Sequence, residues 1–336
     1  MTDSITLRLP DAEFTHSAGA SLARTLPAVP VTVWLTGELG AGKTTFLQGL
    51  ASALGIRDRL TSPTFALEQR YQTADGTPLI HIDLYRLAGA DAERLLHASE
   101  EHTGIRCVEW ADRLPSFSGG IHVHLAEGEE RTTRKLIVTF ADFPIPTEAE
   151  IETWRDEMAL PVIIRRHCDA VAQTADRLGE RKRAQGCLLR PAALHAAARL
   201  HDLLRPVDFR QGAAHIEEEI SPERAARWKN LRTTYAGMKH EAAAAAFLEE
   251  RGFPGIADIV RTHGLTLSAS TRVTIEQQIL YYADKRVKID EVVSLEERLR
   301  DFTARYAPNG VLPAAENWYE EARQTEHELF PNGVPF

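Results

Sequence analysis

The chain has 336 residues, enough for two domains that each bury a core, and its formal net charge of −9 argues against binding DNA or RNA by bulk electrostatics. Its three cysteines form no C-x-x-C pair, which argues against structural zinc and a disulfide framework and favours a reducing compartment. No apolar run approaches the ~20 residues of a membrane span and no signal pattern opens the chain, so we expect a cytoplasmic protein without membrane contact.

Up to about residue 140, β-branched apolar stretches alternate with helical patterns, which predicts an α/β domain with a mainly parallel sheet flanked by helices. The predicted strands are Ile5–Leu9, Val31–Leu35, Leu79–Ile82, Ile105–Val108, Ile121–Leu125 and Lys135–Phe140.

A glycine-rich segment follows the second of these strands and fits the pattern G-x-x-x-x-G-K-[ST]. Apolar residues at helical spacing follow it over 46–54, with Gly55 as a stop. Because the strand–loop–helix context matches, we prefer a phosphate-binding loop to an ordinary glycine-rich turn. Backbone N–H groups and the helix N-terminus would hold phosphate oxygens, Lys43 would reach the terminal phosphates, and the Thr44 hydroxyl would ligate Mg²⁺. The expected nucleotide contacts are Gly37, Gly40, Ala41, Gly42, Lys43, Thr44 and Thr45.

Two carboxylates follow later strands. Asp83 ends the stretch Leu79–Ile82, and Glu109 ends Ile105–Val108. Each alone could be a helix cap or a surface acid. Because parallel strands end at the same sheet edge, the pair behind a phosphate loop favours a place at the metal or the attacking water.

Four blocks in this order resemble the TsaE family, the small ATPases of bacterial tRNA threonylcarbamoyladenosine (t⁶A) synthesis, over about residues 3–140. The blocks are Gly37–Phe46, Thr61–Phe65, His81–Leu87 and Val108–Leu114. The resemblance implies ATP as the nucleotide, Mg²⁺ held by Thr44 and Glu109, and hydrolysis supported by Asp83 and Glu109. It also implies a switch-like loop at Ser62-Pro63-Thr64, Trp110 beside the nucleotide, and Thr15 near the adenine.

TsaE-like proteins act on a TsaB–TsaD heterodimer, so the resemblance implies this complex as the partner and tRNA as an indirect one. The stretch Ala88–Gly104 departs from the family pattern, which leaves the docking surface open there and allows a docking module that does not hydrolyse ATP. A small-molecule kinase with a P-loop is a competing interpretation, but residues 1–140 contain no second lid or arginine-rich segment of the kind a kinase needs.

The composition changes after two prolines, Pro144 and Pro146, where Thr147-Glu148-Ala149-Glu150 predicts a capping box at a helix start. From Ile151 to Ala307 nearly all of the sequence is helical in composition. We therefore expect a P-loop domain over residues 1–142, a linker over 143–155 and an all-α bundle with a C-terminal extension over 156–336.

Six histidine and aspartate positions stand out in the helical part, and most of them lie on separate predicted helices. Imidazole plus carboxylate suits Fe, Mn, Ni or Zn, and two such ions could bridge a hydroxide. We expect the other histidines to be ordinary surface or core residues, including His195, six residues before His201 and so on another face of its helix. The six positions are His167, His201, Asp202, His240, His263 and Asp284.

Residues 160–306 resemble the HD-domain phosphohydrolase superfamily. The resemblance implies His167, His201, Asp202 and Asp284 as the metal core, with His240 and His263 as the extra histidines of two-metal members such as the YqeK-type dinucleoside tetraphosphate hydrolases. Arg205 would take the place of a lysine that contacts phosphate. The segments that carry it are Arg166–Cys168, Leu200–Asp202, Lys239–Glu241, Gly252–Gly264, Thr274–Gln278 and Tyr282–Val287.

The two resemblances predict a bifunctional protein, an ATPase joined to a metal-dependent phosphohydrolase acting on a nucleotide. A nucleoside monophosphate is favoured as substrate, with a dinucleoside polyphosphate or a cyclic nucleotide as alternatives. The alternative belongs to a different class of function. In it, the helical half senses a nucleotide and regulates the ATPase without hydrolysing that nucleotide.

Overall fold

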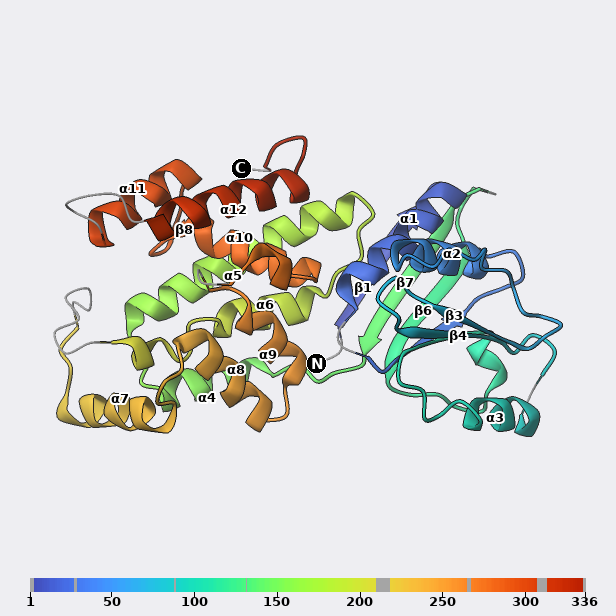
Figure 1. The fold of residues 1–336 in the computed structure, drawn as a ribbon, viewed down its shortest axis with the longest axis horizontal. Helices are drawn as coiled ribbons and strands as arrows, with labels where there is room; N and C mark the ends of the chain where they lie inside the picture. Colours follow the sequence, from blue (N-terminus) through green and yellow to red (C-terminus); the bar gives the residue numbers. More distant parts are fainter. Residues whose placement is uncertain are drawn as a thin grey trace. The chain divides into compact units, whose positions relative to one another are not determined.

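The computed structural model describes residues 3–26, 29–87, 89–130, 132–209, 218–264, 267–306 and 313–334 (Figure 1). The chain forms two compact units, which we call the α/β unit and the helical unit. The α/β unit contains Thr2–Phe143 together with Lys182–Arg190, and the helical unit contains Pro144–Arg181 and Pro191–Phe336. No helix of the described ranges is both long enough and apolar enough to span a membrane.

The α/β unit is built on a seven-stranded mixed sheet in the order β1-β7-β6-β2-β5-β4-β3. Its central pairs, β6–β2, β2–β5 and β5–β4, are parallel, and the outer pairs are antiparallel. The strands are β1 (Asp3–Leu9), β2 (Val31–Thr36), β3 (Glu68–Gln72), β4 (Pro78–Asp83), β5 (Ile105–Glu109), β6 (Gly120–Glu127) and β7 (Arg134–Ala141).

All six predicted strands are confirmed, and the parallel centre agrees with the expected α/β class. The sequence did not predict β3, whose residues Glu68-Gln69-Arg70-Tyr71-Gln72 are largely polar. An edge strand that is exposed or half-buried along its length has no apolar alternation to reveal it.

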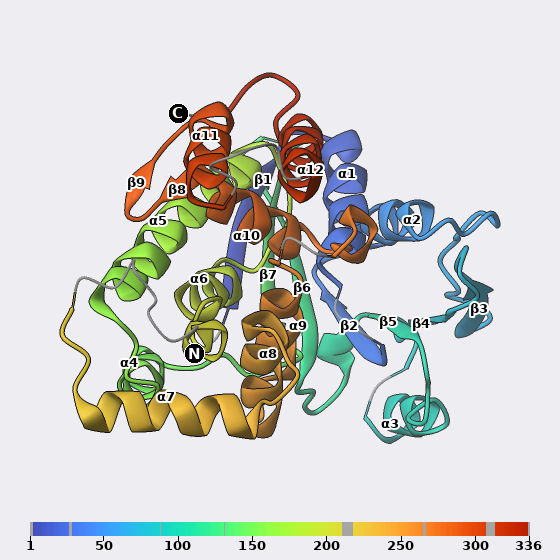
Figure 2. The same cartoon turned by 60° about the vertical axis from the view of Figure 1, so that its left-hand side comes forward.

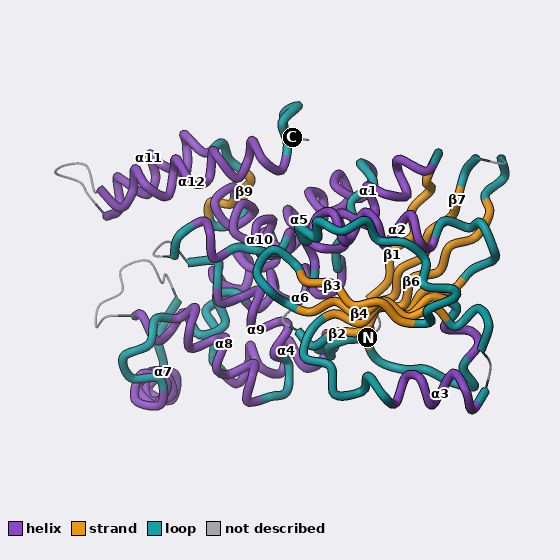
Figure 3. The backbone as a smooth tube through the Cα atoms, turned by 45° about the vertical axis from the view of Figure 1, so that its right-hand side comes forward, coloured by secondary structure: helices purple, strands orange, loops and turns teal. Residues whose placement is uncertain are grey.

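Helices cover both faces of this sheet (Figure 3). The helices α1 (Ala12–Leu22) and α2 (Lys43–Ala53) pack with one face, in a core that includes Val33 and Leu35 of β2. The helix α3 (Ala90–His97) packs with the other face, where Trp34 points. Alternate residues of the buried β2 thus enter two cores. Short 3₁₀ turns follow α1 at Ala23–Thr25 and β5 at Ala111–Arg113.

The segment Lys182–Arg190 completes the α/β unit, although residues of the other unit both precede and follow it in sequence. Leu188 is fully buried in the same core as α1 and α2, and its N–H donates to Oγ of Ser21 at 2.9 Å. The buried guanidinium of Arg190 donates two bonds to Asp142, of 2.6 and 2.7 Å, and a third to the carbonyl of Thr25. A bidentate pair of this kind fixes both distance and orientation.

The helical unit begins with α4 (Glu148–Glu157), where the predicted capping box between Thr147 and Glu150 is present. This helix occupies most of the stretch expected as a linker, and its Trp154 and Arg155 are buried. The remaining helices are α5 (Val162–Ala184), α6 (Pro191–Leu200), α7 (Pro222–Thr234), α8 (His240–Glu250), α9 (Pro254–Arg261), α10 (Ile275–Arg286), α11 (Leu295–Tyr306) and α12 (Pro313–Leu329).

In this unit α9 packs against α6, α8 and α10, and α6 also packs against α10 (Figure 2). The expectation of an all-α bundle holds apart from a two-stranded hairpin of β8 (Val287–Lys288) and β9 (Glu291–Val292) directly after α10. Ile289 lies in the turn of this hairpin and has a φ of 59°, which a β-branched residue rarely adopts. Short 3₁₀ turns lie at Arg205–Asp208 and Ala269–Thr271.

Candidate functional site

A glycine-rich loop joins β2 to α2 in the α/β unit. Gly37, Gly40 and Gly42 have φ values of 133°, 81° and 104°, which L-residues with side chains rarely adopt. A Cβ on Gly37 would lie 2.1 Å from the carbonyl oxygen of Leu125, whereas nothing lies within 4 Å of a Cβ on Gly40. The loop is therefore packed at its start and open in the middle, a shape that lets backbone N–H groups face an anion.

Lys43, the first residue of α2, is buried beside this loop. Its ammonium donates to the carbonyl oxygens of Gly37 at 2.7 Å and Glu38 at 2.9 Å. It also lies 3.6 Å from the ring centre of Trp110, which takes a left-handed conformation with φ 61°. Burial lowers the pKa of Lys43, although nearby acids including Glu109 oppose the shift.

Thr44 and Glu109 meet at the sheet edge. The Thr44 hydroxyl lies 3.0 and 3.2 Å from the two oxygens of Glu109, and Nε2 of His81 lies 3.0 Å from Oε1. Asp83 pairs in register with Glu109 on the neighbouring parallel strand. A hydroxyl and two carboxylates are hard oxygen donors of the kind that Mg²⁺ prefers, so the residues present fit a magnesium nucleotide.

The carboxylate of Asp83 holds the loop that contains Ser62 and Thr64. Its Oδ2 accepts bonds from both hydroxyls, at 2.6 and 2.7 Å, and its Oδ1 accepts one from the N–H of Tyr85. A change in the surroundings of Asp83 therefore reaches this loop directly.

The other expected contacts of this site lie around the loop. Thr15 of α1 is buried, with its methyl group 3.3 Å from the position of a Cβ on Gly42. Ala41 is buried and Thr45 is half-buried. His81, expected to be a surface or core residue and not a ligand, is fully buried, and its Nε2 faces Glu109. Its place two residues before Asp83 on β4, hence on the same face, was the available signal.

The six histidine and aspartate side chains of the helical unit come together in its interior, and all are buried. His167 lies on α5, His201 and Asp202 directly follow α6, and His240 opens α8. His263 follows α9 by two residues, and Asp284 lies near the end of α10.

These side chains form two groups that meet at Asp202. In the first, Nε2 of His167 lies 3.0 Å from Oδ1 of Asp284, and Nε2 of His201 lies 3.7 Å from the same oxygen. Nε2 of His201 also lies 3.9 Å from Oδ2 of Asp202.

In the second group, Oδ1 of Asp202 lies 3.0 Å from Nε2 of His240 and 3.8 Å from Nε2 of His263. The two imidazole nitrogens of His240 and His263 are themselves 3.3 Å apart. Asp202 thus turns one oxygen to each group, which is the arrangement needed to bridge two cations.

The Nδ1 atoms of the four histidines have partners of their own. Those of His167, His201 and His263 face the backbone carbonyls of Ile289 at 2.9 Å, Ala198 at 2.8 Å and Val260 at 2.6 Å. These contacts leave the Nε2 atoms free to face the aspartates, as metal-binding histidines require.

Several side chains of the cluster have pKa values far from their usual ones. Burial disfavours ionised Asp202, but Arg205, His201 and His240 outweigh it and hold the pKa of that carboxyl well below its usual range. For Asp284, Lys285 and His167 overcome burial in the same way and lower the pKa. Burial also opposes a charge on His240, yet its contacts with Asp202 and Asp208 raise the pKa to about 9. Both carboxylates are therefore anionic at neutral pH.

The donor set fits one or two transition-type divalent cations. Among the described residues, Nε2 of His201 is one of the few buried polar side-chain atoms that make no hydrogen bond, and it faces both aspartates. An orphaned imidazole nitrogen between two carboxylates is costly unless a cation completes it. Imidazole and carboxylate together suit Fe, Mn, Ni or Zn.

Two cations of the protein border this cluster. Nη1 of Arg205 lies 3.1 Å from Nε2 of His240 and 3.8 Å from Oδ1 of Asp202, with the side chain one-third exposed. Lys285, which was not predicted, is buried and donates to Oδ2 of Asp284 and, at 3.3 Å, to the carbonyl of His263. Its neighbour Asp284 was the available signal, although adjacency in sequence does not show where an amine points.

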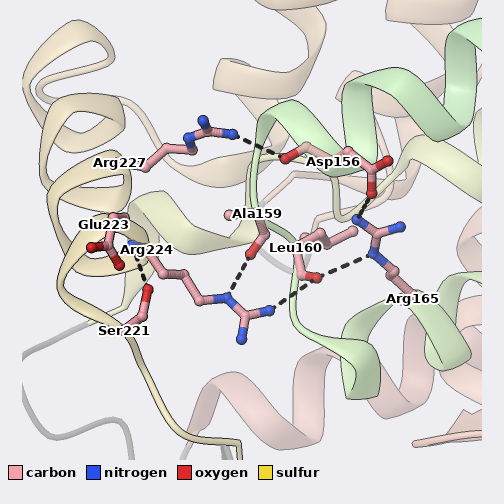
Figure 4. A pocket seen from close by; sticks show the side chains of 8 residues that line it. All are labelled: Asp156, Ala159, Leu160, Arg165, Ser221, Glu223, Arg224 and Arg227. Atoms are coloured by element: carbon pink, nitrogen blue, oxygen red, sulfur yellow. Dashed lines mark hydrogen bonds and ion pairs between the residues drawn. The ribbon is translucent and has the colours of Figure 1, made fainter.

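A cavity of about 320 Å³ lies elsewhere in the helical unit (Figure 4). Its arginines already serve the end of α4: Arg224 donates to the carbonyls of Ala159 and Leu160, and Arg227 to that of Asp156. Arg224 and Arg227 are therefore occupied by backbone carbonyls at and just after the end of α4. Its lining residues are Asp156, Ala159, Leu160, Arg165, Ser221, Glu223, Arg224 and Arg227.

Known families match the two parts of the chain separately. Residues 9–136 match the family described as threonylcarbamoyl adenosine biosynthesis protein TsaE, and residues 164–287 match the HD domain. The tRNA threonylcarbamoyladenosine biosynthesis protein TsaE of Synechocystis is 39% identical, over 34% of this chain and 75% of the relative. The TsaE proteins of Nostoc and Aquifex aeolicus are each 40% identical, over 39% and 38% of this chain and 84% and 91% of theirs.

A crystal structure of YdiB from Bacillus subtilis is also similar, at 29% identity and a TM-score of 0.34, over 42% of this chain and 88% of that one.

The sheet and its glycine-rich loop place the α/β unit among the P-loop proteins, and the buried histidine–aspartate cluster lies in a helical bundle. The chain belongs to the TsaE family through its α/β unit, and it carries an HD domain in its helical unit.

Proposed function

We propose that the α/β unit hydrolyses ATP in support of t⁶A formation on tRNA. The observation that carries this proposal is the meeting of Thr44, Glu109 and Asp83 beside the Lys43 loop. The names of the TsaE relatives place those proteins in tRNA threonylcarbamoyladenosine biosynthesis.

Each residue has a distinct part in this proposal. Lys43 and the backbone of the loop bind the terminal phosphates, while Thr44 and Glu109 hold Mg²⁺, which neutralises charge on the transferring phosphoryl group. Asp83 and Glu109 orient the attacking water. Thr15 and Trp110 flank the nucleotide, as their contacts with Gly42 and Lys43 suggest.

The partner in this proposal is a TsaB–TsaD complex, which holds the tRNA, so that an acidic chain needs no basic surface of its own. The stretch that departs from the family pattern contains α3, which packs on the sheet through Ala92 and Leu96. The remaining face of α3 is then the part of the docking surface that differs from the relatives.

For the helical unit we propose a metal-dependent phosphohydrolase that acts on a nucleotide, with a nucleoside monophosphate ahead of a dinucleoside polyphosphate. The carrying observation is the unpartnered Nε2 of His201 within a set of buried imidazoles and ionised carboxylates. When bound, the metal supplies an activated water at neutral pH.

The protein's own residues supply position and charge. His167, His201 and Asp284 form one ligand group, His240 and His263 form the other, and Asp202 joins them. Arg205, partly exposed at the edge of the cluster, is placed to contact a substrate phosphate.

The test is hydrolysis of AMP, dAMP, threonylcarbamoylated AMP, cyclic AMP, diadenosine tetraphosphate and ATP, with Mn²⁺ or Fe²⁺, followed by chromatography of the nucleoside and nucleotide products. We compare the parent with Asp202→Ala and Lys43→Ala. A substrate lost only with Asp202→Ala supports the hydrolase and identifies its class. No turnover of any compound except ATP, with ATP turnover dependent on Lys43, supports instead an ATPase that carries a nucleotide-sensing HD domain.

A further inference from the structure

The Nδ1 contacts of the four clustered histidines are not alike. Three of these atoms face backbone carbonyls, of Ile289, Ala198 and Val260. A backbone carbonyl is neutral and fixed by the fold.

The fourth histidine, His240, faces carboxylates instead. Its Nδ1 lies 2.5 Å from Oδ2 of Asp208 and 3.3 Å from Oε2 of Glu241. Asp208 ends the 3₁₀ turn that begins at Arg205, only six residues after Asp202. The short segment after Asp202 therefore returns to hold another member of the same group.

Resting on the proposed metal centre, we propose that Asp208 is a positioning residue for the second metal position, formed by Asp202, His240 and His263. A carboxylate that accepts the Nδ1 proton of an imidazole fixes its tautomer, so that Nε2 faces the metal, and makes that nitrogen a stronger donor. Nε2 of His240 already lies 3.0 Å from Oδ1 of Asp202 and 3.3 Å from Nε2 of His263.

Asp208 serves one position and not the other. Asp208 pairs with His240 of the second group, whereas the hydrogen bonds and ion pairs of His167, His201 and Asp284 within the described residues go to other partners. Removal of the Asp208 charge therefore weakens one of two binding events and spares the other.

Replacement by asparagine gives the sharpest variant, because the shape is kept. An amide can turn its NH₂ group toward Nδ1, which moves the imidazole proton to Nε2, where the metal must bind. Asp208→Glu keeps the charge and should restore much of the affinity. Asp176→Asn is the matched control, because Asp176 holds Nδ1 of His195 at 2.9 Å outside the cluster.

The experiment is Mn²⁺ titration of the full chain by calorimetry, with the metal content measured after dialysis. We expect two bound ions in the parent, and in Asp208→Asn a loss of about 10- to 100-fold in the affinity of one ion only. Asp176→Asn should match the parent.

The inference is overturned if Asp208→Asn binds both ions as tightly as the parent does. It is also overturned if the parent itself binds only one ion. An equal loss of both ions also overturns it, if circular dichroism shows the variant folded. If Asp208→Asn does not fold, Asp208→Glu decides: two ions with the second within a few-fold of the parent support the inference, and loss of the second ion contradicts it. These readouts need no turnover, so a failure of the proposed hydrolase activity would be seen separately, as metal binding without hydrolysis of any nucleotide tested.

Discussion

The hydroxyl of Thr44 donates a 3.0 Å hydrogen bond to Glu109, although the two residues are 65 positions apart in the chain. The bond joins the first turn of α2 to the end of β5, where Asp83 is the register partner of Glu109. A hydroxyl and two carboxylates thereby face one small volume at the edge of the sheet.

Glu109→Gln should lower ATP turnover by about 10²- to 10⁴-fold while nucleotide affinity changes little, because the amide keeps the shape but loses the charge. Turnover is measured with the TsaB–TsaD complex present. Affinity is measured separately on the chain alone, by the change in intrinsic tryptophan fluorescence, to which Trp110 is one of five contributors. Glu127→Gln, an exposed carboxylate at the end of β6, is the control and should match the parent. Unchanged turnover in Glu109→Gln would refute the assignment.

Gly37→Ala should destabilise the α/β unit more than Gly40→Ala. Both positions have positive φ, which costs an L-residue about 1–2 kcal/mol, but only at Gly37 would the new Cβ meet a backbone oxygen, at 2.1 Å. Thermal unfolding of the two variants measures the difference. Equal losses would mean that the loop start can move away from Leu125.

Removal of metal should destabilise the helical unit. An ion present at a hundred times its dissociation constant stabilises the folded state by about 2.7 kcal/mol, and chelation removes this term. We expect Mn²⁺ to raise the unfolding temperature of the parent and of Lys43→Ala, but not of Asp202→Ala, because Asp202 belongs to both ligand groups. A rise in Asp202→Ala equal to that in the parent would place the ion elsewhere.

His195 should contribute stability that depends on pH. Its hydrogen bond to Asp176, at 2.9 Å, raises its pKa above the usual value despite partial burial. A raised folded-state pKa stabilises the fold fully below the unfolded pKa of about 6.5, and the effect is lost as the pH rises through the folded pKa.

Because the His195 side chain is one-third exposed, we expect a contribution of a few tenths to about 1 kcal/mol. The free energy of unfolding of His195→Gln relative to the parent should therefore differ more at about pH 5.5 than at about pH 9. A difference that is the same at both values would show that the pair is not ionised in the fold.

Leu188→Ala should destabilise the α/β unit by about 2–5 kcal/mol, the usual cost of truncating a fully buried leucine. The loss should appear in the unfolding transition that Mg²⁺ and ATP stabilise. Cys187→Ala, at a half-buried neighbour, is the control. A loss confined to the transition that Mn²⁺ stabilises would contradict the placement of Leu188 in this core.

The strands and the phosphate loop could be predicted because their signals are local. A buried strand such as β2 is apolar along its length, and the loop residues from Gly37 to Thr45 are contiguous. β3 could not be predicted, since an exposed edge strand needs no apolar pattern. The clustered histidines lie far apart in sequence, and only the family resemblance singled them out from the thirteen in the chain.

The contacts around the two sites could not be predicted from the sequence, for a different reason. His81, Asp208 and Lys285 each contact a partner that is distant in sequence, and each residue type is common in ordinary surroundings. These partners are Glu109, His240 and the carbonyl of His263. The burial of Leu188 could not be predicted either. In sequence Leu188 lies between α5 and α6, but its side chain is buried in the core of the α/β unit.

The α/β unit is made of two segments that are separated in the sequence, and this limits which truncations of the gene leave a whole unit. Because Lys182–Arg190 belongs to the α/β unit, a stop codon after Phe143 would remove the helical unit and would also remove Leu188 and Arg190 from the α/β unit. A C-terminal deletion therefore cannot discard the helical unit and leave the α/β unit whole. The two halves are inherited together and made in equal numbers, so neither can be regulated by its own expression.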